Sequence, residues 1–169
     1  MPPRILDISP LVSERLAVYP GDVPYRRQVS HRLGGGDTVE LSSITATVHL
    51  GAHADAPSHF LPGGASIDRL PLEPYVGPCQ VVEVPVTAAL GVRPAHLQEE
   101  IAAPRVLFKT GSAPDPERFA PGYAGLTAEI ADFLAGRRCV LVGIDTPSVD
   151  PADDEHLEAH RALARHGIA

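Results

Sequence analysis

The sequence predicts an α/β or α+β fold, because a segment with a helical pattern leads directly into a strand with the composition of a buried one. In residues 126–135 the apolar side chains recur at helical spacing, and Gly136 follows as a stop. Residues 139–144 form a continuous apolar run, which is typical of a strand covered on both faces. With 169 residues, 44% hydrophobic and 21% charged, the chain suits one domain, residues 1–169, with its own core.

Other strands are predicted from alternation and from short apolar runs. Residues 39–50 alternate between apolar and polar, so we expect a strand with one apolar face, and His49 lies on the opposite face near its end. Gly51 breaks this alternation. Short β-branched or apolar runs bounded by Pro and Gly predict strands at residues 80–84 and 105–109.

A last helix is expected near the end of the sequence. It would begin at residues 153–155, whose three acidic side chains suit the positive end of the helix dipole, and end before Gly167. His156 and His160 are four residues apart and would share one face of this helix. The glycines at residues 34–36 lack the strand-to-helix context of a phosphate loop and predict a flexible turn.

The charge balance and the cysteine usage exclude several classes of protein. Lys and Arg number 14 against 21 Asp and Glu, a formal charge of −7, which argues against a nucleic-acid surface. No apolar run approaches the roughly 18–20 residues of a membrane span, and the N-terminal residues lack the apolar core of a signal peptide. Cys79 and Cys139 are far apart and indicate buried thiols in a reducing compartment. We therefore expect a cytoplasmic protein without a nucleic-acid or membrane partner.

The residues most informative about chemistry are three histidines and one aspartate within eleven positions: His49, His53, Asp55 and His59. Imidazole and carboxylate together form the ligand set of Zn, Mn, Fe or Ni. In extended backbone, His53 and Asp55 point to the same side, and a turn at Gly51 would let His49 reach the same point. His59 beside a metal would suit a general acid or base. The alternative is that these are ordinary surface or hydrogen-bonded histidines.

Three further residues are candidates with two interpretations each. His160, with or without His156, would complete a metal site from a distant segment, or would lie on a solvated helix face. Asp145 ends a buried strand, where active-site groups concentrate, or it caps the following turn. The sequence contains no phosphate-loop motif with Lys, no Gly-x-Ser-x-Gly elbow and no paired-cysteine zinc spacing.

The histidine-rich stretch resembles the signature of the cyclase-like metal-dependent hydrolases, and it reads His49-x-Gly51-x-His53-x-Asp55-Ala56-Pro57-x-His59. Other stretches are similar to members of this family that act on N-formyl-L-kynurenine. They are Asp7-Ile8-Ser9-Pro10, Tyr19-Pro20-Gly21-Asp22, Tyr75-Val76-Gly77-Pro78-Cys79, Gly143-Ile144-Asp145-Thr146-Pro147-Ser148, and Ala159-His160 before Arg165-His166-Gly167. The resemblance extends from Asp7 to the last residue.

The resemblance implies a set of metal ligands. His49, His53 and Asp55 would bind metal, with Asp55 bridging two zinc ions, and His160 would bind the second ion; manganese is an alternative metal. His59 would be the catalytic acid and base. The implied fold is a swivelling β/β/α-type mixed β-sheet, barrel-like, with outer helices.

The resemblance also implies a reaction, a substrate contact and an oligomeric state. The reaction would be hydrolysis of N-formyl-L-kynurenine to L-kynurenine and formate, a step of tryptophan degradation. Tyr19 stands where such enzymes often carry a Trp that contacts the substrate ring, and this sequence has no Trp. Alternatives are hydrolysis of another amide or cyclic amide such as isatin, or an inactive, truncated metal-binding domain. Family members form homodimers or higher homo-oligomers.

The sequence departs from the family after Ala169. Relatives continue there into a strand whose Glu bridges both metals, so we expect a C-terminal strand to be missing and a sheet edge to be exposed.

Overall fold

The structure, a computed structural model, describes residues 5–87 and 90–169. Within this part the chain divides into two compact units. The first unit comprises Met1–His53 and Asp115–Phe119, and the second comprises Ala54–Pro114 and Ala120–Ala169. The prediction of a single domain over residues 1–169 stays a prediction.

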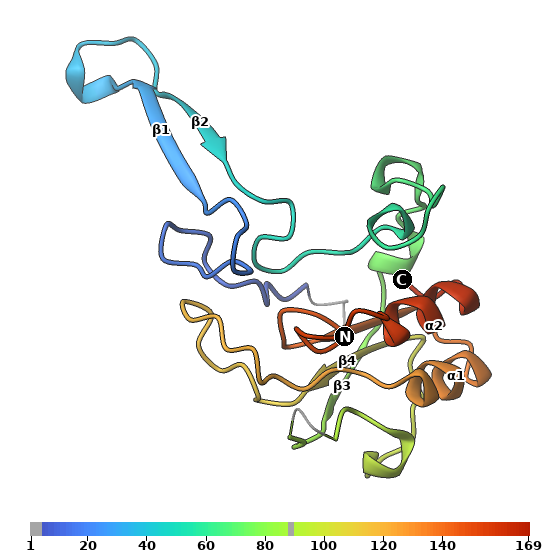
Figure 1. Ribbon diagram of the computed structural model, residues 1–169. Helices are drawn as coiled ribbons and strands as arrows, with labels where there is room; N and C mark the ends of the chain where they lie inside the picture. The colour runs from blue at the N-terminus through green and yellow to red at the C-terminus, as the bar shows by residue number, and fades with distance from the viewer. Residues whose placement is uncertain (1–4, 88–89) are drawn as a thin grey trace. The chain divides into compact units, whose positions relative to one another are not determined.

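The first unit is built around a β-hairpin, in which β1 (Arg26–His31) pairs antiparallel with β2 (Leu41–Thr45) (Figure 1). The register shifts between Val29 and His31, which marks a bulge. The connection contains a short 3₁₀ helix, Leu33–Gly35, and Gly36 follows it with a φ of +98°. The turn predicted from the three glycines is therefore confirmed.

The strand predicted over residues 39–50 is shorter than expected and lacks a buried face. β2 ends at Thr45; Thr47 still donates its backbone N–H to the carbonyl of Val23, and residues 48 and 49 form a turn. Ile44 and Val48, two members of the predicted apolar face, are 63% and 86% exposed. Alternation shows which side chains share a face, but the pairing of only two strands leaves that face uncovered.

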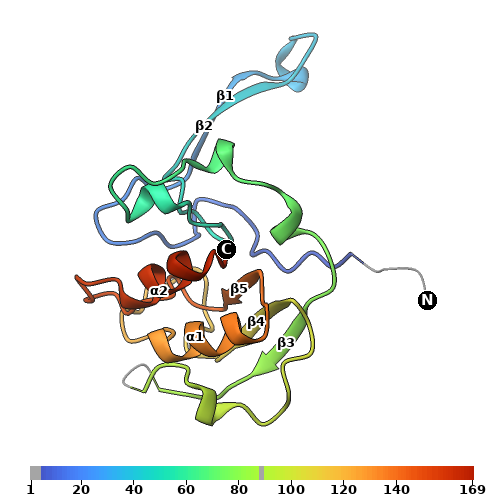
Figure 2. The same ribbon diagram turned by 90° about the vertical axis from the view of Figure 1, so that its right-hand side faces the viewer.

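The second unit contains a parallel sheet in the order β3-β4-β5 (Figure 2). The strands are β3 (Gln80–Glu83), β4 (Arg105–Lys109) and β5 (Leu141–Ile144), which confirms all three predicted strands. Their alternate residues form one buried face of the sheet, and Val82, Val106, Phe108 and Val142 are at most 8% exposed. The α/β class is confirmed; the strands of the described residues form two separate sheets and no closed barrel.

Helix α1 (Ala128–Gly136) confirms the helix predicted between β4 and β5. It begins after Thr127, whose side chain accepts a hydrogen bond from the backbone N–H of Ile130, as an N-cap should. Ile130 and Leu134 lie on the buried stripe and are fully buried. The helix and the parallel strands share one hydrophobic core.

Helix α2 (Glu158–His166) begins later than residues 153–155. Leu157, directly before it, has a left-handed φ of +52°, which interrupts helical geometry at that point. Asp154 instead accepts hydrogen bonds from the backbone N–H groups of His156 and Glu158. His156 therefore lies outside the helix, exposed, and the prediction that it shares a helix face with His160 is wrong.

The end of the described chain returns to the sheet. Gly167, with a φ of +65°, caps α2 as predicted. Ala169 then donates its N–H to the carbonyl of Val140 and accepts from the N–H of Val142, in the pattern of a parallel strand next to β5. Figure 2 shows α1 and α2 side by side, and a hydrogen bond of 2.7 Å between His166 Nε2 and Asp132 Oδ1 joins them.

Two further sequence expectations concern single residues and membranes. Cys139 is buried, as expected, but Cys79 is exposed, because it lies in the irregular turn before β3 and not within the strand. In the described part of the chain, no helix is long and apolar enough to cross a bilayer.

Candidate functional site

His59 is held by a compact loop in the second unit. The loop begins with the 3₁₀ helix Pro57–His59 and returns at Gly64. Ser58 donates its backbone N–H to Ala65, and the carbonyl of Pro57 accepts from two residues of the loop. A Cβ on Gly64 would lie 2.5 Å from the carbonyl carbon of Pro57, so only glycine permits the two sides of the loop to approach this closely. These contacts therefore fix the main chain that carries the predicted acid and base, His59.

His160 projects from the first turn of α2 and is nearly inaccessible, with 4% exposure. Its Nδ1 donates to Asp150 Oδ2 at 2.6 Å, and the carboxylate, which only accepts, assigns the proton to Nδ1. Its Nε2 faces Asp55 Oδ2 at 3.3 Å. The structure thus brings His160 together with Asp55, and the interpretation of His160 as a residue of a solvated helix face is wrong.

The neighbouring side chains of His160 and Asp150 shift each other's pKa. Burial disfavours the charged imidazole of His160, but the hydrogen bonds with Asp150 and Asp55 outweigh burial and raise the pKa of His160 to about 9. Burial likewise disfavours the charged carboxylate of Asp150, but the hydrogen bonds from His160 and from the backbone of Ala159 hold the pKa of Asp150 below its usual range. In the metal-free chain, the two hydrogen bonds therefore favour the charged form of the His160 imidazole.

The aromatic rings of Phe60 and His59 lie near His160, and both of these residues line a depression in the surface. The ring of Phe60 lies 5.0 Å from that of His160, and the ring of His59 lies 6.1 Å from it. A cavity of about 470 Å³ is lined by residues 58–64 and by Leu157. The predicted catalytic histidine therefore borders both a cavity and the His160–Asp55 pair.

His49 and His53 lie together in the first unit. Their rings are 5.0 Å apart and nearly perpendicular. His53 Nδ1 donates to the carbonyl oxygen of Gly51 at 2.8 Å, so Nε2 is the nitrogen of His53 with ligand character. Gly51 adopts a φ of +60°, which confirms the predicted turn. Chain connectivity keeps the Cα of His53 within about 7 Å of that of Asp55, two residues further on.

The residues of the second unit fit a metal ion. A carboxylate oxygen and an imidazole nitrogen are ligands of zinc and manganese. Ligands about 2.0–2.1 Å from a tetrahedral zinc ion lie roughly 3.3 Å from each other. The distance between Asp55 Oδ2 and His160 Nε2 is 3.3 Å. These two atoms are therefore spaced as two ligands of one ion would be.

The other candidate residues have different surroundings. Tyr19 is 49% exposed, and its ring meets the edge of Phe119 at 5.2 Å within the first unit. Asp145 accepts hydrogen bonds from the backbone of Thr110 and Gly111 and from the Thr110 hydroxyl, so it fastens the turn after β4. The turn that Asp145 holds lies after β4 and is not the one that follows Asp145 in the sequence, so both interpretations of Asp145 stay predictions.

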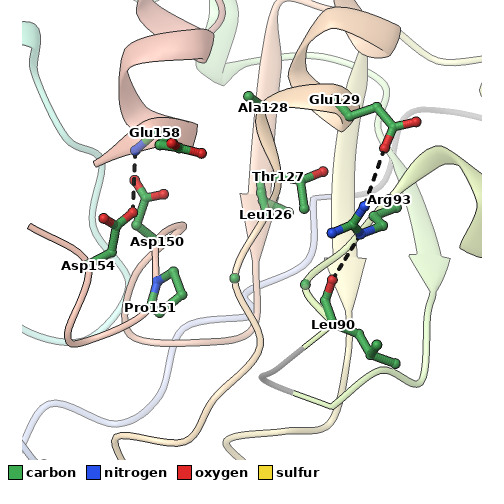
Figure 3. Close-up of a pocket in the computed structure, with 12 residues that line it drawn as sticks. Leu90, Arg93, Leu126, Thr127, Ala128, Glu129, Asp150, Pro151, Asp154 and Glu158 are labelled. Atoms are coloured by element: carbon green, nitrogen blue, oxygen red, sulfur yellow. Dashed lines mark hydrogen bonds and ion pairs between the residues drawn. The ribbon is translucent and has the colours of Figure 1, made fainter. Parts of the chain in front are cut away.

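A second cavity, of about 380 Å³, lies at the N-terminal ends of α1 and α2 (Figure 3). Arg93 on its wall lies 3.9 Å from Glu129, and Asp154 accepts from the backbone of Glu158. Among the described residues that line this cavity, none is predicted for catalysis or metal binding. The cavity borders Asp150, whose carboxylate accepts hydrogen bonds from the ring of His160 and from the backbone N–H of Ala159 in α2.

Sequence reasoning missed two residues of the site, Asp150 and Phe60. Phe60 directly follows the predicted catalytic histidine, so its position in the motif was a usable signal. Asp150 has no local signal, because its bond to His160 depends on how the chain before α2 folds back onto the helix.

Comparisons with known proteins identify the family. The Cyclase family model matches residues 6–151. Kynurenine formamidase of Bordetella pertussis is 41% identical over 171 residues, covering 98% of this chain and 79% of the relative. Kynurenine formamidase of Polaromonas naphthalenivorans is 44% identical over 167 residues, covering 98% and 74%.

A solved structure described as a potential metal-dependent hydrolase with cyclase activity superposes with a TM-score of 0.75 at 26% identity. It is matched over 96% of this chain and 77% of that chain. This likeness and the ligand chemistry of the site support a metal cofactor. The sequence motif, the fold and the relatives agree, and the chain belongs to the Cyclase family.

Proposed function

We propose that this protein is a metal-dependent amidohydrolase that converts N-formyl-L-kynurenine and water to L-kynurenine and formate. The observation that carries the proposal is the cluster of Asp55, His59 and His160, of which His59 also lines an open depression of about 470 Å³. The names of the two relatives at 41% and 44% identity supply the substrate. In this proposal residues 1–169 act as one hydrolase domain.

The proposed ligands are His49, His53, Asp55 and His160, which would hold zinc, two ions per chain, with manganese as the alternative metal. The spacing of Asp55 Oδ2 and His160 Nε2 and the imidazole and carboxylate chemistry of the four side chains support this assignment. When bound, the metal supplies Lewis acidity, which polarises the formyl carbonyl and activates water.

His59 has the role of acid and base. Its imidazole accepts the proton of the attacking water and donates a proton to the aniline nitrogen as the bond between the formyl carbon and nitrogen breaks. The backbone hydrogen bonds of the loop position the main chain of His59, so fewer conformations have to be restricted before the transfer. Phe60 and Leu157 give the cavity apolar walls, and Tyr19 is the proposed contact for the aromatic ring of the substrate.

The test is a metal analysis followed by an activity assay. We expect close to two zinc or manganese ions per chain, loss of these ions and of activity on chelation, and recovery when metal is returned. N-formyl-L-kynurenine should be the best substrate in a panel that includes isatin and a cyclic imide. A higher rate with isatin would replace the proposed substrate, and a chain that holds no metal would be the inactive alternative.

We also propose that the protein is a cytoplasmic homodimer, since closed two-fold symmetry is the commonest arrangement of soluble oligomers. Light scattering coupled to size-exclusion chromatography measures the mass directly. A single peak at the mass of one chain would contradict the dimer.

A further inference from the structure

We propose that Asp150 is a positioning residue, which holds the ring of His160 so that Nε2 is presented toward a metal ion at Asp55. This inference rests on the proposed metal centre. It goes beyond the ligand set, because Asp150 contacts no substrate and binds no metal in this assignment.

Asp150 contacts both the imidazole ring of His160 and the helix α2, which carries this histidine. Asp150 is 2% exposed. Its Oδ2 accepts from His160 Nδ1 at 2.6 Å and from the His160 backbone N–H at 3.0 Å. Its Oδ1 accepts from the backbone N–H of Ala159 at 2.8 Å. One carboxylate therefore fixes both the first turn of α2 and the rotation of the imidazole.

Asp150 is itself held by its backbone neighbours. The carbonyl of Val149 accepts the N–H of Leu126 at 2.6 Å, just before α1. Gly125 packs so closely against this segment that a Cβ there would lie 2.8 Å from Val149 O and 3.1 Å from Pro151 Cδ. These contacts restrict the backbone on both sides of Asp150, so its carboxylate can hold the imidazole of His160 in one orientation.

The chemistry of imidazole makes this contact important for a metal. A histidine whose Nδ1 donates a proton keeps the lone pair of Nε2 for a metal, and a carboxylate partner both orients the ring and strengthens its donor nitrogen. Without an acceptor at Nδ1, the ring can rotate or carry its proton on Nε2, and in either state the lone pair of Nε2 is not presented to an ion at Asp55. Nε2 already lies 3.3 Å from Asp55 Oδ2, on the side away from Asp150.

The decisive variant is Asp150→Asn, which has nearly the same shape. An amide has one acceptor oxygen and a donor NH₂ group, so it cannot accept from the ring and from both backbone N–H groups. The NH₂ group favours the tautomer of His160 that carries its proton on Nε2. The matched control is Asp154→Asn, because Asp154 also accepts backbone N–H groups at the start of α2 and its bonds are to His156 and Glu158 instead of His160.

The experiment measures the affinity for Zn²⁺ alone by competition with a chromophoric chelator, and the unfolding midpoint of each metal-free variant. We expect Asp150→Asn to weaken Zn²⁺ binding about 10- to 100-fold, while Asp154→Asn binds as the wild type does. Equal Zn²⁺ affinity of Asp150→Asn and wild type would overturn the proposal. An equal loss in Asp154→Asn would assign the effect to helix capping and would overturn it too.

A second measurement uses the wild type and tests the proposal even if Asp150→Asn does not fold. Nitrogen NMR of ¹⁵N-histidine in the zinc-loaded wild type should show His160 protonated at Nδ1 and metal-bound through Nε2. The opposite tautomer would overturn the proposal. A wild type that binds Zn²⁺ normally but does not hydrolyse N-formyl-L-kynurenine would contradict the proposed function and leave the role of Asp150 standing, whereas a wild type without Zn²⁺ affinity would overturn both.

Discussion

Replacing Gly64 by alanine should displace the loop that carries His59. A Cβ at this position would lie 2.5 Å from the carbonyl carbon of Pro57, 2.6 Å from its oxygen and 2.8 Å from the nitrogen of Ser58. Ordinary contact begins near 3.4 Å, so the backbone must shift by about 1 Å. All three atoms belong to the main chain, and no side-chain rotation can remove the clash.

The size of the effect follows from this displacement. Overpacking of this kind costs about 2 kcal/mol of unfolding free energy, which corresponds to a fall in melting temperature of roughly 4–8 °C for a chain of this size. A shift of about 1 Å in a catalytic group can lower kcat about 100-fold. Because the clash lies next to His59, we expect both effects in Gly64→Ala.

The assay compares kcat on N-formyl-L-kynurenine and the melting temperature of Gly64→Ala with those of Gly136→Ala. Gly136 is the last residue of α1, and a methyl group added there would meet none of the described atoms within 4 Å. The Gly136→Ala variant should therefore keep full activity and a melting temperature at least equal to that of the wild type. A Gly64→Ala protein with wild-type kcat and melting temperature would refute the steric reasoning about the loop.

Three further predictions concern the site and the core. His59→Ala should lower kcat by about 10²- to 10⁴-fold with unchanged metal content by elemental analysis; loss of metal would make His59 a ligand instead. In the metal-free protein, the pKa of His160 is raised from 6.5 to about 9 by its bonds with Asp150 and Asp55, so its stabilising contribution is complete below pH 6.5 and is lost as pH rises through 9. A shift of this size corresponds to at most about 3 kcal/mol, and urea unfolding of the chelated protein at pH 6 and pH 9.5 measures it; equal or higher stability at pH 9.5 would contradict it. Phe108→Ala, at a 1% exposed position of β4, should cost about 3–5 kcal/mol by the same unfolding assay, and a loss under 1 kcal/mol, on the order of a surface change, would show that this core is loosely packed.

The predictable part of the fold was the part with local patterns. The three strands of the parallel sheet and α1 were identified from apolar runs, helical spacing and glycine stops, because these patterns act within a few residues of the chain. The start of α2 was missed, since its acidic residues suit a helix terminus but Leu157 adopts a left-handed conformation that no sequence rule signals for leucine. The length and exposure of β2 were missed because alternation does not report whether a third layer covers the strand.

The sequence by itself determined the chemistry available to this protein: three histidines and an aspartate at a spacing that marks the family, together with the helix-and-strand pattern of an α/β layer. The tertiary structure decided which of these groups meet. His160 joins Asp55 across 105 residues of sequence, and Asp150 turns the imidazole toward it. Residue types and short spacings can be read from the sequence. The contact between Asp55 and His160 forms only when α2 has packed onto the core, and no local pattern near either residue indicates the other.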